Sequence, residues 1–249
     1  MGKKWKGIVG ALICLMLTAG HAGAYTITDN YWGGEVSSNS YSNRDVIGDA
    51  WRFDIVSMDV SRNGNTLNVT INGPYFSAYS NTQTYGMKPG DLFISNNGWN
   101  MGSQSSPYPN DTISDGEQWE YAFVLGEAGT GYLYDIKYGT ITPTNIDGIS
   151  GIYRQNQEWQ FDPSSTTGQS IGSGTWTISG NQFLLSFDIS NMTMAGDSLG
   201  FHWAMQCGND VIEGSTPVPE PGTMLLLGSG LLGLVGFRKK LNRKTHDLD

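Results

Sequence analysis

The amino-acid sequence predicts an all-β protein: one antiparallel domain of the β-sandwich or jelly-roll type, flanked by an N-terminal signal peptide and a C-terminal transmembrane helix. Three observations favour this fold class. Apolar and polar residues alternate along many short stretches of the body, and glycine-containing turn pairs separate these stretches. In addition, both ends of the chain are apolar segments that lie beside Lys and Arg.

The body, residues 25–214, carries the strand pattern. Residues 51–55 and 67–71 alternate strictly between apolar and polar side chains, which predicts a strand in each. Residues 176–189 hold two such stretches around Ser179-Gly180-Asn181, which predicts a β-hairpin. Because no polar stretch inside the body is long enough to mark a boundary, we expect a single domain.

The N-terminus has the three parts of a secretory signal peptide, which we assign to residues 1–24. Three lysines precede an uncharged, mostly apolar run from Gly7 to Gly20, and Ala22-Gly23-Ala24 is a small-residue cleavage site. We expect the Sec export machinery to carry the chain and cleavage to follow Ala24, so that Tyr25 is the first mature residue. An uncleaved membrane anchor is the alternative, but the run is short for a membrane span.

The C-terminus has a second membrane-targeting pattern. Residues 215–221 form a proline-rich linker, residues 222–237 are uncharged and rich in Leu and Gly, and residues 238–249 form a basic tail. The apolar segment would span about 24 Å as a helix, against roughly 30 Å of hydrocarbon, so we expect a marginal transmembrane helix. The positive-inside rule places the basic tail in the cytoplasm and the body outside.

Charge is divided unevenly along the chain and limits its partners. The whole chain has a formal net charge of −9, but residues 25–221 hold only 6 Lys or Arg residues against 21 Asp or Glu residues. Such an acidic body repels the phosphates of nucleic acid, so nucleic-acid binding is not expected.

Pro219-Glu220-Pro221, the apolar segment after it and the basic stop Arg238-Lys239-Lys240 together resemble a PEP-CTERM sorting signal. The resemblance implies that an exosortase, a membrane-embedded processing enzyme, cuts the chain near the motif. It also implies a Gram-negative bacterium that makes exopolysaccharide and biofilm matrix. The precursor would be held transiently in the inner membrane, and the product would reach the cell surface or be secreted.

Three stretches of the body, residues 45–48, 90–99 and 201–214, resemble exosortase-dependent surface proteins. Their arrangement is also loosely similar to the sugar- and haem-binding sandwich modules of the DOMON kind. Neither resemblance supplies a catalytic residue for this chain.

The body offers few of the residues that catalysis or zinc binding requires. His202 is its only histidine and Cys207 its only cysteine, and their spacing puts them on opposite faces of a strand. We therefore expect no catalytic site, with Cys207 packed inward and His202 facing outward or capping a polar network. Carboxylate pairs such as Glu117 and Glu120 leave a secreted glycoside hydrolase as the least favoured alternative.

Calcium is the one cofactor for which the loops offer ligands, because acidic and amide residues supply hard oxygen atoms. Two candidate clusters are Asp111, Asp115 and Glu117, and Asn209, Asp210 and Glu213. Neither follows the EF-hand spacing, and surface charge that keeps the protein soluble is the alternative.

Aromatic residues near Gly, Asn and Pro give a second hint of ligand binding. Exposed rings beside amides and carboxylates suit sugars, which stack on the ring and hydrogen-bond through their hydroxyls. The four candidates are Trp32, Trp99, Tyr108 and Trp159. The alternative is that these rings close the ends of the core.

These patterns favour a non-enzymatic exported protein of the cell surface or extracellular matrix, processed by an exosortase and linked to exopolysaccharide or biofilm. A carbohydrate-binding module that acts on exopolysaccharide is the alternative function.

Overall fold

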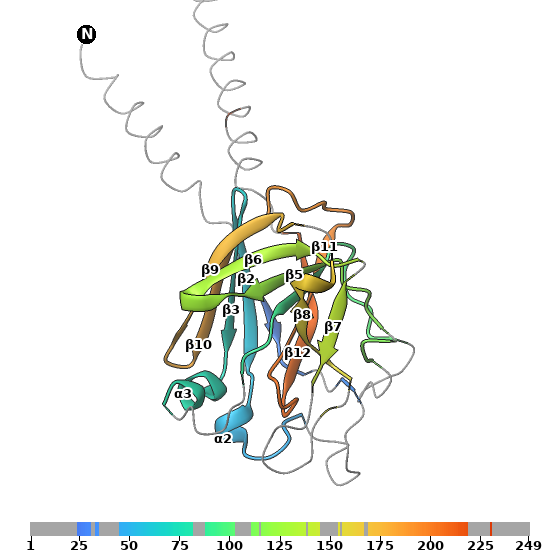
Figure 1. Ribbon diagram of the computed structural model, residues 1–249. Coiled ribbons are helices and arrows are strands. Elements are labelled where there is room, and N and C mark those ends of the chain that lie inside the picture. The colour runs from blue at the N-terminus through green and yellow to red at the C-terminus, as the bar shows by residue number, and fades with distance from the viewer. Residues whose placement is uncertain are drawn as a thin grey trace, which may run out of the picture.

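A computed structural model gives the fold (Figure 1) and describes residues 24–30, 33–34, 45–81, 88–102, 111–114, 116–137, 139–144, 154, 156–166, 169–218 and 230. The strands are β1 (Tyr25–Thr28), β2 (Ser57–Asn63), β3 (Thr66–Asn72), β4 (Leu92–Ser95), β5 (Tyr121–Leu125), β6 (Thr130–Asp135), β7 (Thr140–Pro143), β8 (Glu158–Asp162), β9 (Gly172–Ser179), β10 (Gln182–Asp188), β11 (Ser198–Ala204) and β12 (Val211–Pro217). The helices are α2 (Ala50–Phe53), α3 (Pro74–Asn81) and the 3₁₀ turns η3 (Glu127–Gly129) and η4 (Pro163–Ser165).

Ten of these strands form one antiparallel sheet in the order β1-β2-β3-β10-β9-β6-β5-β4-β11-β12. The sheet curls until its two edge strands meet. A Cβ atom built on Gly214 of β12 would lie 2.7 Å from Ile27 Cγ2 of β1, which shows how close the two edges are. Figure 1 shows the resulting nearly closed barrel. The antiparallel all-β class is confirmed, and the predicted hairpin forms as β9–β10 with Gln182 opposite Ser179.

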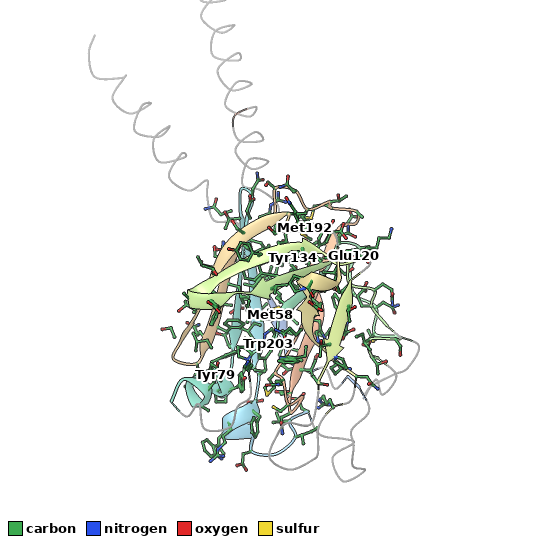
Figure 2. The ribbon with its side chains drawn as sticks, viewed as in Figure 1. Met58, Tyr79, Glu120, Tyr134, Met192 and Trp203 are labelled. Carbon is green, nitrogen blue, oxygen red and sulfur yellow. The ribbon has the colours of Figure 1, made fainter. Side chains whose placement is uncertain are left out.

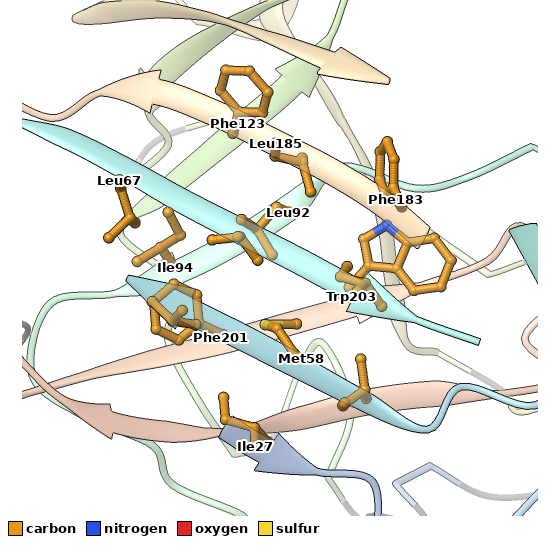
Figure 3. Packing of buried hydrophobic residues seen from close by; sticks show 14 of the residues in the cluster. Ile27, Met58, Leu67, Leu92, Ile94, Phe123, Phe183, Leu185, Phe201 and Trp203 are labelled. Atoms are coloured by element: carbon orange, nitrogen blue, oxygen red, sulfur yellow. The ribbon is translucent and has the colours of Figure 1, made fainter. Parts of the chain in front are cut away.

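The interior of the curled sheet is a continuous apolar core (Figure 3). Alternate residues of the strands point into it, among them Leu67, Leu185 and Phe201. The rings of Phe123 and Phe187 stack with their centroids 4.4 Å apart. Burying each such side chain stabilises the fold by about 1.5–3 kcal/mol, so this core holds the sheet in its curled form.

Helix α3 closes one end of the core, and the sequence pattern does not predict it. Phe76 on this helix packs its ring 5.4 Å from Trp203 and 5.5 Å from Phe183, measured between centroids. Pro74 is the first helical residue, a position where the missing N–H of proline costs no hydrogen bond. The helix thus covers an end of the barrel that strands alone leave open.

The strand predicted over residues 51–55 is wrong, because Ala50–Phe53 form the short helix α2. The N–H of Phe53 donates to the Asp49 carbonyl at 3.1 Å, and the N–H of Asp54 donates to the Ala50 carbonyl at 3.1 Å. Trp51 is left 64% exposed on this turn. Alternation over so short a segment does not distinguish a helical turn from a strand.

A second, smaller sheet of β7 and β8 covers the outer face of the main sheet at β5 and β11. It encloses an outer apolar cluster that includes Phe93, Trp119 and Phe161. Asp91 joins the two layers, because its carboxylate accepts the N–H groups of Leu125 on β5 and Phe161 on β8, each at 2.9 Å. Strands β4, β5 and β11 are consequently buried on both faces.

The ends of the folded body lie close to the predicted processing points. Tyr25, the expected first mature residue, is the first residue of β1. At the other end β12 continues to Pro217, which pairs with Ser198 of β11. Residues 215–217 therefore belong to the strand and not to the linker that the sequence predicts, because proline is tolerated at the end of an edge strand.

Most of the two targeting segments falls outside the described residues. These segments include Ala22, the sorting motif Pro219-Glu220-Pro221 and the basic stop Arg238-Lys239-Lys240. Among the residues that are described, no helix has the length and apolar character needed to cross a bilayer. The transmembrane helix over residues 222–237 stays a prediction.

Candidate functional site

A half-open cleft of about 400 Å³ lies between the loop that follows β4 and the segment that precedes β5. Its lining residues are one aromatic ring, three amide side chains, one carboxylate and one glycine: Trp99, Asn97, Asn100, Gln118, Glu117 and Gly116. Such a combination of a ring with convergent polar groups is typical of a small-ligand site.

Local hydrogen bonds fix the two walls of the cleft. Ser95 Oγ donates to Asn97 Oδ1 at 2.6 Å, which shapes the turn after β4. Asn100 Nδ2 donates across the cleft to the Gly116 carbonyl at 3.3 Å. The Trp99 ring is half-buried. It packs against the outer apolar cluster and against Ala204 and Val211, which holds its remaining face in a fixed orientation.

Among the described residues that line the cleft, Glu117 is the one that is ionisable. Its side chain is largely buried, and the N–H of Gln118 donates to Oε1 at 3.1 Å. Burial raises the pKa of the Glu117 carboxyl, and the nearby charge of Glu120 raises it further, while a hydrogen bond from Ser95 lowers it. The cleft therefore contains a partly desolvated carboxylate that attracts positive charge.

The cleft lies beside the point where the chain leaves the folded body. The Asn96 N–H donates to the Glu120 carboxylate at 2.9 Å, and Figure 2 shows Glu120 at the end of the molecule away from α3. The Asn96 carbonyl accepts the N–H of Gly196 at 2.9 Å, and the neighbouring Asp197 carbonyl accepts that of Val218 at 2.9 Å. Val218 is the residue directly before the Pro219-Glu220-Pro221 motif.

A buried acid–base group lies beneath β8. His202 is fully buried, with Nε2 3.7 Å from Glu158 Oε2 and Nδ1 3.7 Å from Glu213 Oε2. Nε2 also lies 2.8 Å from the backbone carbonyl of Glu158. Burial raises the pKa of Glu158 to about 7; the His202 charge lowers it and the Glu213 charge raises it. All three side chains are buried, so their charges interact inside the folded domain.

An acidic cluster joins the N-terminal part of the body to β12. Asp29, Asp45 and Asp210 bring carboxylate oxygens within 4.8 Å of one another. Arg154 lies beside them, and its guanidinium donates to the carbonyls of Asp45 and Gly33. Burial and the Asp45 charge raise the pKa of Asp210 well above its usual value, and the Arg154 charge lowers it. Arg154 thus supplies positive charge to a group of one buried and two half-buried carboxylates.

Two residues that the sequence predicts for different roles meet in the cleft. Trp99 is predicted as a sugar-stacking ring and Glu117 as a calcium ligand, yet both line the same cavity.

Trp159 is not an exposed loop ring, because it is buried in β8 and its carbonyl accepts the N–H of Asp91 at 2.9 Å. Outside the described residues lie Trp32, Tyr108 and Asp115.

The predicted calcium cluster near β12 divides among three environments. Asn209 Nδ2 donates to the Ile47 carbonyl at 2.7 Å, Asp210 belongs to the acidic cluster with Arg154, and Glu213 lies beside His202. Residues close in sequence point to different sides of a strand, which separates their side chains.

Two members of the other predicted calcium cluster, Asp111 and Glu117, are described. Asp111 is buried, and its charge raises the pKa of Glu158 on β8. Its carbonyl accepts a bond from Gln157 Nε2 at 2.7 Å. Glu117 lines the cleft, and the Asp111 carboxylate lies against the neighbouring Gly116, because a Cβ built on Gly116 would be 1.9 Å from Asp111 Oδ1. Calcium binding by these two residues stays a prediction.

The structure confirms the predicted positions of Cys207 and His202. Cys207 is buried in the inner core with Met205, and burial raises the pKa of its thiol to about 12. His202 lies on the opposite, outer face of β11, where it connects a polar network and is hidden by β8. The sequence gives no signal for that second layer, because β8 is far from β11 in the chain.

Comparisons with known proteins add one result. Searches of curated proteins and of solved structures gave no significant match. Residues 217–240, however, match the PEP-CTERM protein-sorting motif, which confirms the resemblance seen in the Pro-Glu-Pro triplet, the apolar segment and the basic stop. The chain therefore carries the PEP-CTERM sorting signal of an exported protein that an exosortase processes at the membrane.

Proposed function

We propose that this chain is a non-enzymatic protein of the cell surface or extracellular matrix that works in contact with the exopolysaccharide of its own cell. After export through the Sec machinery, exosortase cleavage near Pro219-Glu220-Pro221 would release the body from the membrane. The observation that carries the proposal is the position of the sorting signal directly behind a complete fold. Strand β12 ends at Pro217, so cleavage at the motif leaves the barrel intact.

The charged groups of the body support a non-enzymatic role. The carboxyls of Asp91, Glu158 and Asp210 have strongly raised pKa values, but all three side chains are buried. Asp91 and Asp210 each accept two backbone N–H bonds, a structural use of a carboxyl group. None of the three lines the cleft.

Subcellular fractionation of the native host with a Glu220→Ala variant tests the sorting step. We expect the wild-type protein in the surface or secreted fraction, with an intact mass that starts at Tyr25 and lacks residues 222–249. The variant should accumulate in the inner membrane at full C-terminal length. Glu127→Ala, a matched change on the exposed η3 turn, should leave processing unchanged. Retention of residues 222–249 in the wild-type product contradicts the proposal.

Carbohydrate binding is a second candidate function, and the cleft is the observation that favours it. Trp99 offers a ring face of fixed orientation, while Asn97, Asn100 and Gln118 offer amide donors and acceptors around it. Sugars are bound by this combination of ring stacking and bidentate amide hydrogen bonds. The exported body would meet such polymers outside the cell.

A pull-down with exopolysaccharide from the native host tests this second function. Trp99→Ala should abolish retention of the protein on the polymer, because it removes the stacking surface. Trp51→Ala removes an exposed tryptophan on α2, away from the cleft, and should leave retention unchanged. Equal retention of the two variants contradicts a binding role for the cleft. Release of reducing sugar that Glu117→Gln abolishes contradicts the non-enzymatic assignment.

A further inference from the structure

We propose that the cleft beside Trp99 selects a saccharide that carries ammonium groups, such as a glycan with unacetylated amino sugars. This inference rests on the proposed carbohydrate-binding function and names the chemical class of the ligand. It follows from the charge of the cleft, the position of its carboxylate and the shape of its walls.

The charge of the cleft is negative. Glu117 is its only ionisable lining residue, and no lysine or arginine lines it among the described residues. Glu120 adds a second carboxylate within electrostatic reach, because its charge acts on Glu117. Residues 25–221 also hold 21 acidic against 6 basic residues. The field of the whole body therefore repels uronic acids and attracts cationic ligands.

The Glu117 carboxylate is placed to pair with an ammonium group. Its side chain is only 7% exposed, and its Oε1 already accepts the N–H of Gln118 at 3.1 Å. The backbone of Asn100 also stabilises the charged form of this carboxyl and lowers its pKa. A charge-assisted hydrogen bond to a partly desolvated carboxylate is about twice as strong as a neutral one.

The remaining walls suit the rest of such a sugar. The Trp99 ring stacks the C–H face of a pyranose and also attracts a nearby cation through its π face. Asn97, Asn100 and Gln118 are exposed and offer their amides to ring hydroxyls. A neutral sugar would use the ring and the amides, whereas an amino sugar would use the carboxylate as well.

Isothermal titration calorimetry with defined oligosaccharides tests the selection. The full chain is held in a zwitterionic, sugar-free detergent and titrated with three β-1,4-linked tetramers, of glucosamine, N-acetylglucosamine and galacturonic acid. The glucosamine tetramer should bind about tenfold more tightly than its acetylated form, the gain expected for one charge-assisted hydrogen bond. Raising the salt concentration should weaken only the glucosamine tetramer, because its added affinity is electrostatic.

Variants locate the effect. Glu117→Gln keeps the shape of the side chain and removes its charge, so it should lower the affinity for the glucosamine tetramer about tenfold and leave the acetylated tetramer within about twofold. Glu127→Gln, the same change at an exposed position on η3, should alter neither affinity. Retained binding of the acetylated tetramer shows that the Gln variant is folded. Should that variant unfold, the salt dependence of the wild-type protein replaces it, because added salt should weaken only the glucosamine tetramer.

The outcomes separate this inference from the function on which it rests. Equal affinities for the glucosamine and acetylated tetramers overturn the selection and leave carbohydrate binding in place. Tightest binding of the galacturonic acid tetramer overturns the selection as well. Failure of all three tetramers, together with Trp99-independent retention on the native polymer, overturns the carbohydrate function itself.

Discussion

The two halves of the curled sheet solve different folding problems. Strands β2, β3 and β10 have one buried face, on which buried residues alternate with half-exposed or exposed ones, and the neighbouring β9 alternates between half-buried and exposed residues. Strands β4, β5 and β11 are buried almost without interruption, because β8 and the outer cluster cover their second face. We call these the one-sided half and the two-sided half.

The difference lies in where each half can put polar groups. In the one-sided half, polar side chains lie on the open face and pair with neighbours across strands, as Ser186 does with Asn68 at 2.8 Å. In the two-sided half, Asp91 and His202 are buried and need partners inside the protein. Buried polar groups cost little when hydrogen-bonded and several kcal/mol when not. We therefore expect polar substitutions to be far more damaging in the two-sided half.

The largest expected effect comes from Arg154, the buried cation beside the acidic cluster at the edge of the two-sided half. Arg154→Met leaves Asp29, Asp45 and Asp210 without this positive charge, and the free energy of unfolding should fall by about 3–5 kcal/mol. Urea unfolding followed by tryptophan fluorescence measures the change. A drop in pH should recover part of the loss by protonating the carboxylates.

The control for that substitution is Arg62→Met in the one-sided half. Arg62 lies near the exposed β2–β3 turn, where its Nε donates to the Gly64 carbonyl at 2.7 Å. Its removal should change stability by no more than about 0.5 kcal/mol. Comparable losses for the two arginines would show that the burial of charge does not distinguish the halves.

Asp91 should give the next largest effect. Asp91→Ala leaves the N–H groups of Leu125 and Phe161 unpaired in the interior, and we expect a loss of about 2–4 kcal/mol in the free energy of unfolding. Asp59→Ala on β2 is the matched change in the one-sided half, where Asp59 accepts a bond from Asn72 Nδ2 at 2.9 Å. That loss should stay near about 1 kcal/mol, because water replaces the lost acceptor.

The pH dependence of stability should also come from the two-sided half. Burial raises the pKa of Glu158 from 4.5 to about 7, so the folded state holds a proton that the unfolded state has released between these values. The contribution of this group to stability is therefore fully present below pH 4.5 and falls as the pH rises towards 7, by at most about 1.4 kcal/mol per pH unit. Asp91, with its pKa also raised to about 7, adds a change of the same sign.

Thermal melts between pH 4.5 and 7.5 measure this dependence. Glu158→Gln should flatten the curve, because the group that binds the proton is gone. Glu127→Gln on the exposed η3 turn should leave the slope as it is in the wild type. A melting temperature that rises steadily from pH 4.5 to 7 in the wild type would contradict the expectation.

The same contrast explains how far the sequence predicts the structure. The one-sided half is readable, because alternation over residues 67–71 and 176–189 and the turn at Gly180 require only local patterns. Cys207 is also predicted correctly to pack inward, although it lies in the turn after β11. Trp99 is identified as a ligand candidate from its loop composition, and the cleft includes it.

The second layer of the two-sided half is not readable in this way, because its covering strand β8 lies far along the chain from the strands that it covers. Asp91, Arg154 and Glu158 look like ordinary surface charges in the sequence, because nothing local shows that they become buried. Glu117 is predicted as a calcium ligand or as one of a carboxylate pair, and only the fold places it beside Trp99.

The smallest expected effect tests whether a turn of the one-sided half is as independent as its open face suggests. Gly180 sits in the β9–β10 turn with a φ of +58°, and a Cβ built on it would meet nothing within 4 Å. Gly180→Ala should therefore cost only the backbone strain of a left-handed alanine, about 1 kcal/mol in urea unfolding. Gly180→Asn should cost less, because asparagine tolerates this conformation. A loss well above that of Asp59→Ala would mean that the hairpin packs against something besides its own strands, and the boundary between the halves would have to be redrawn.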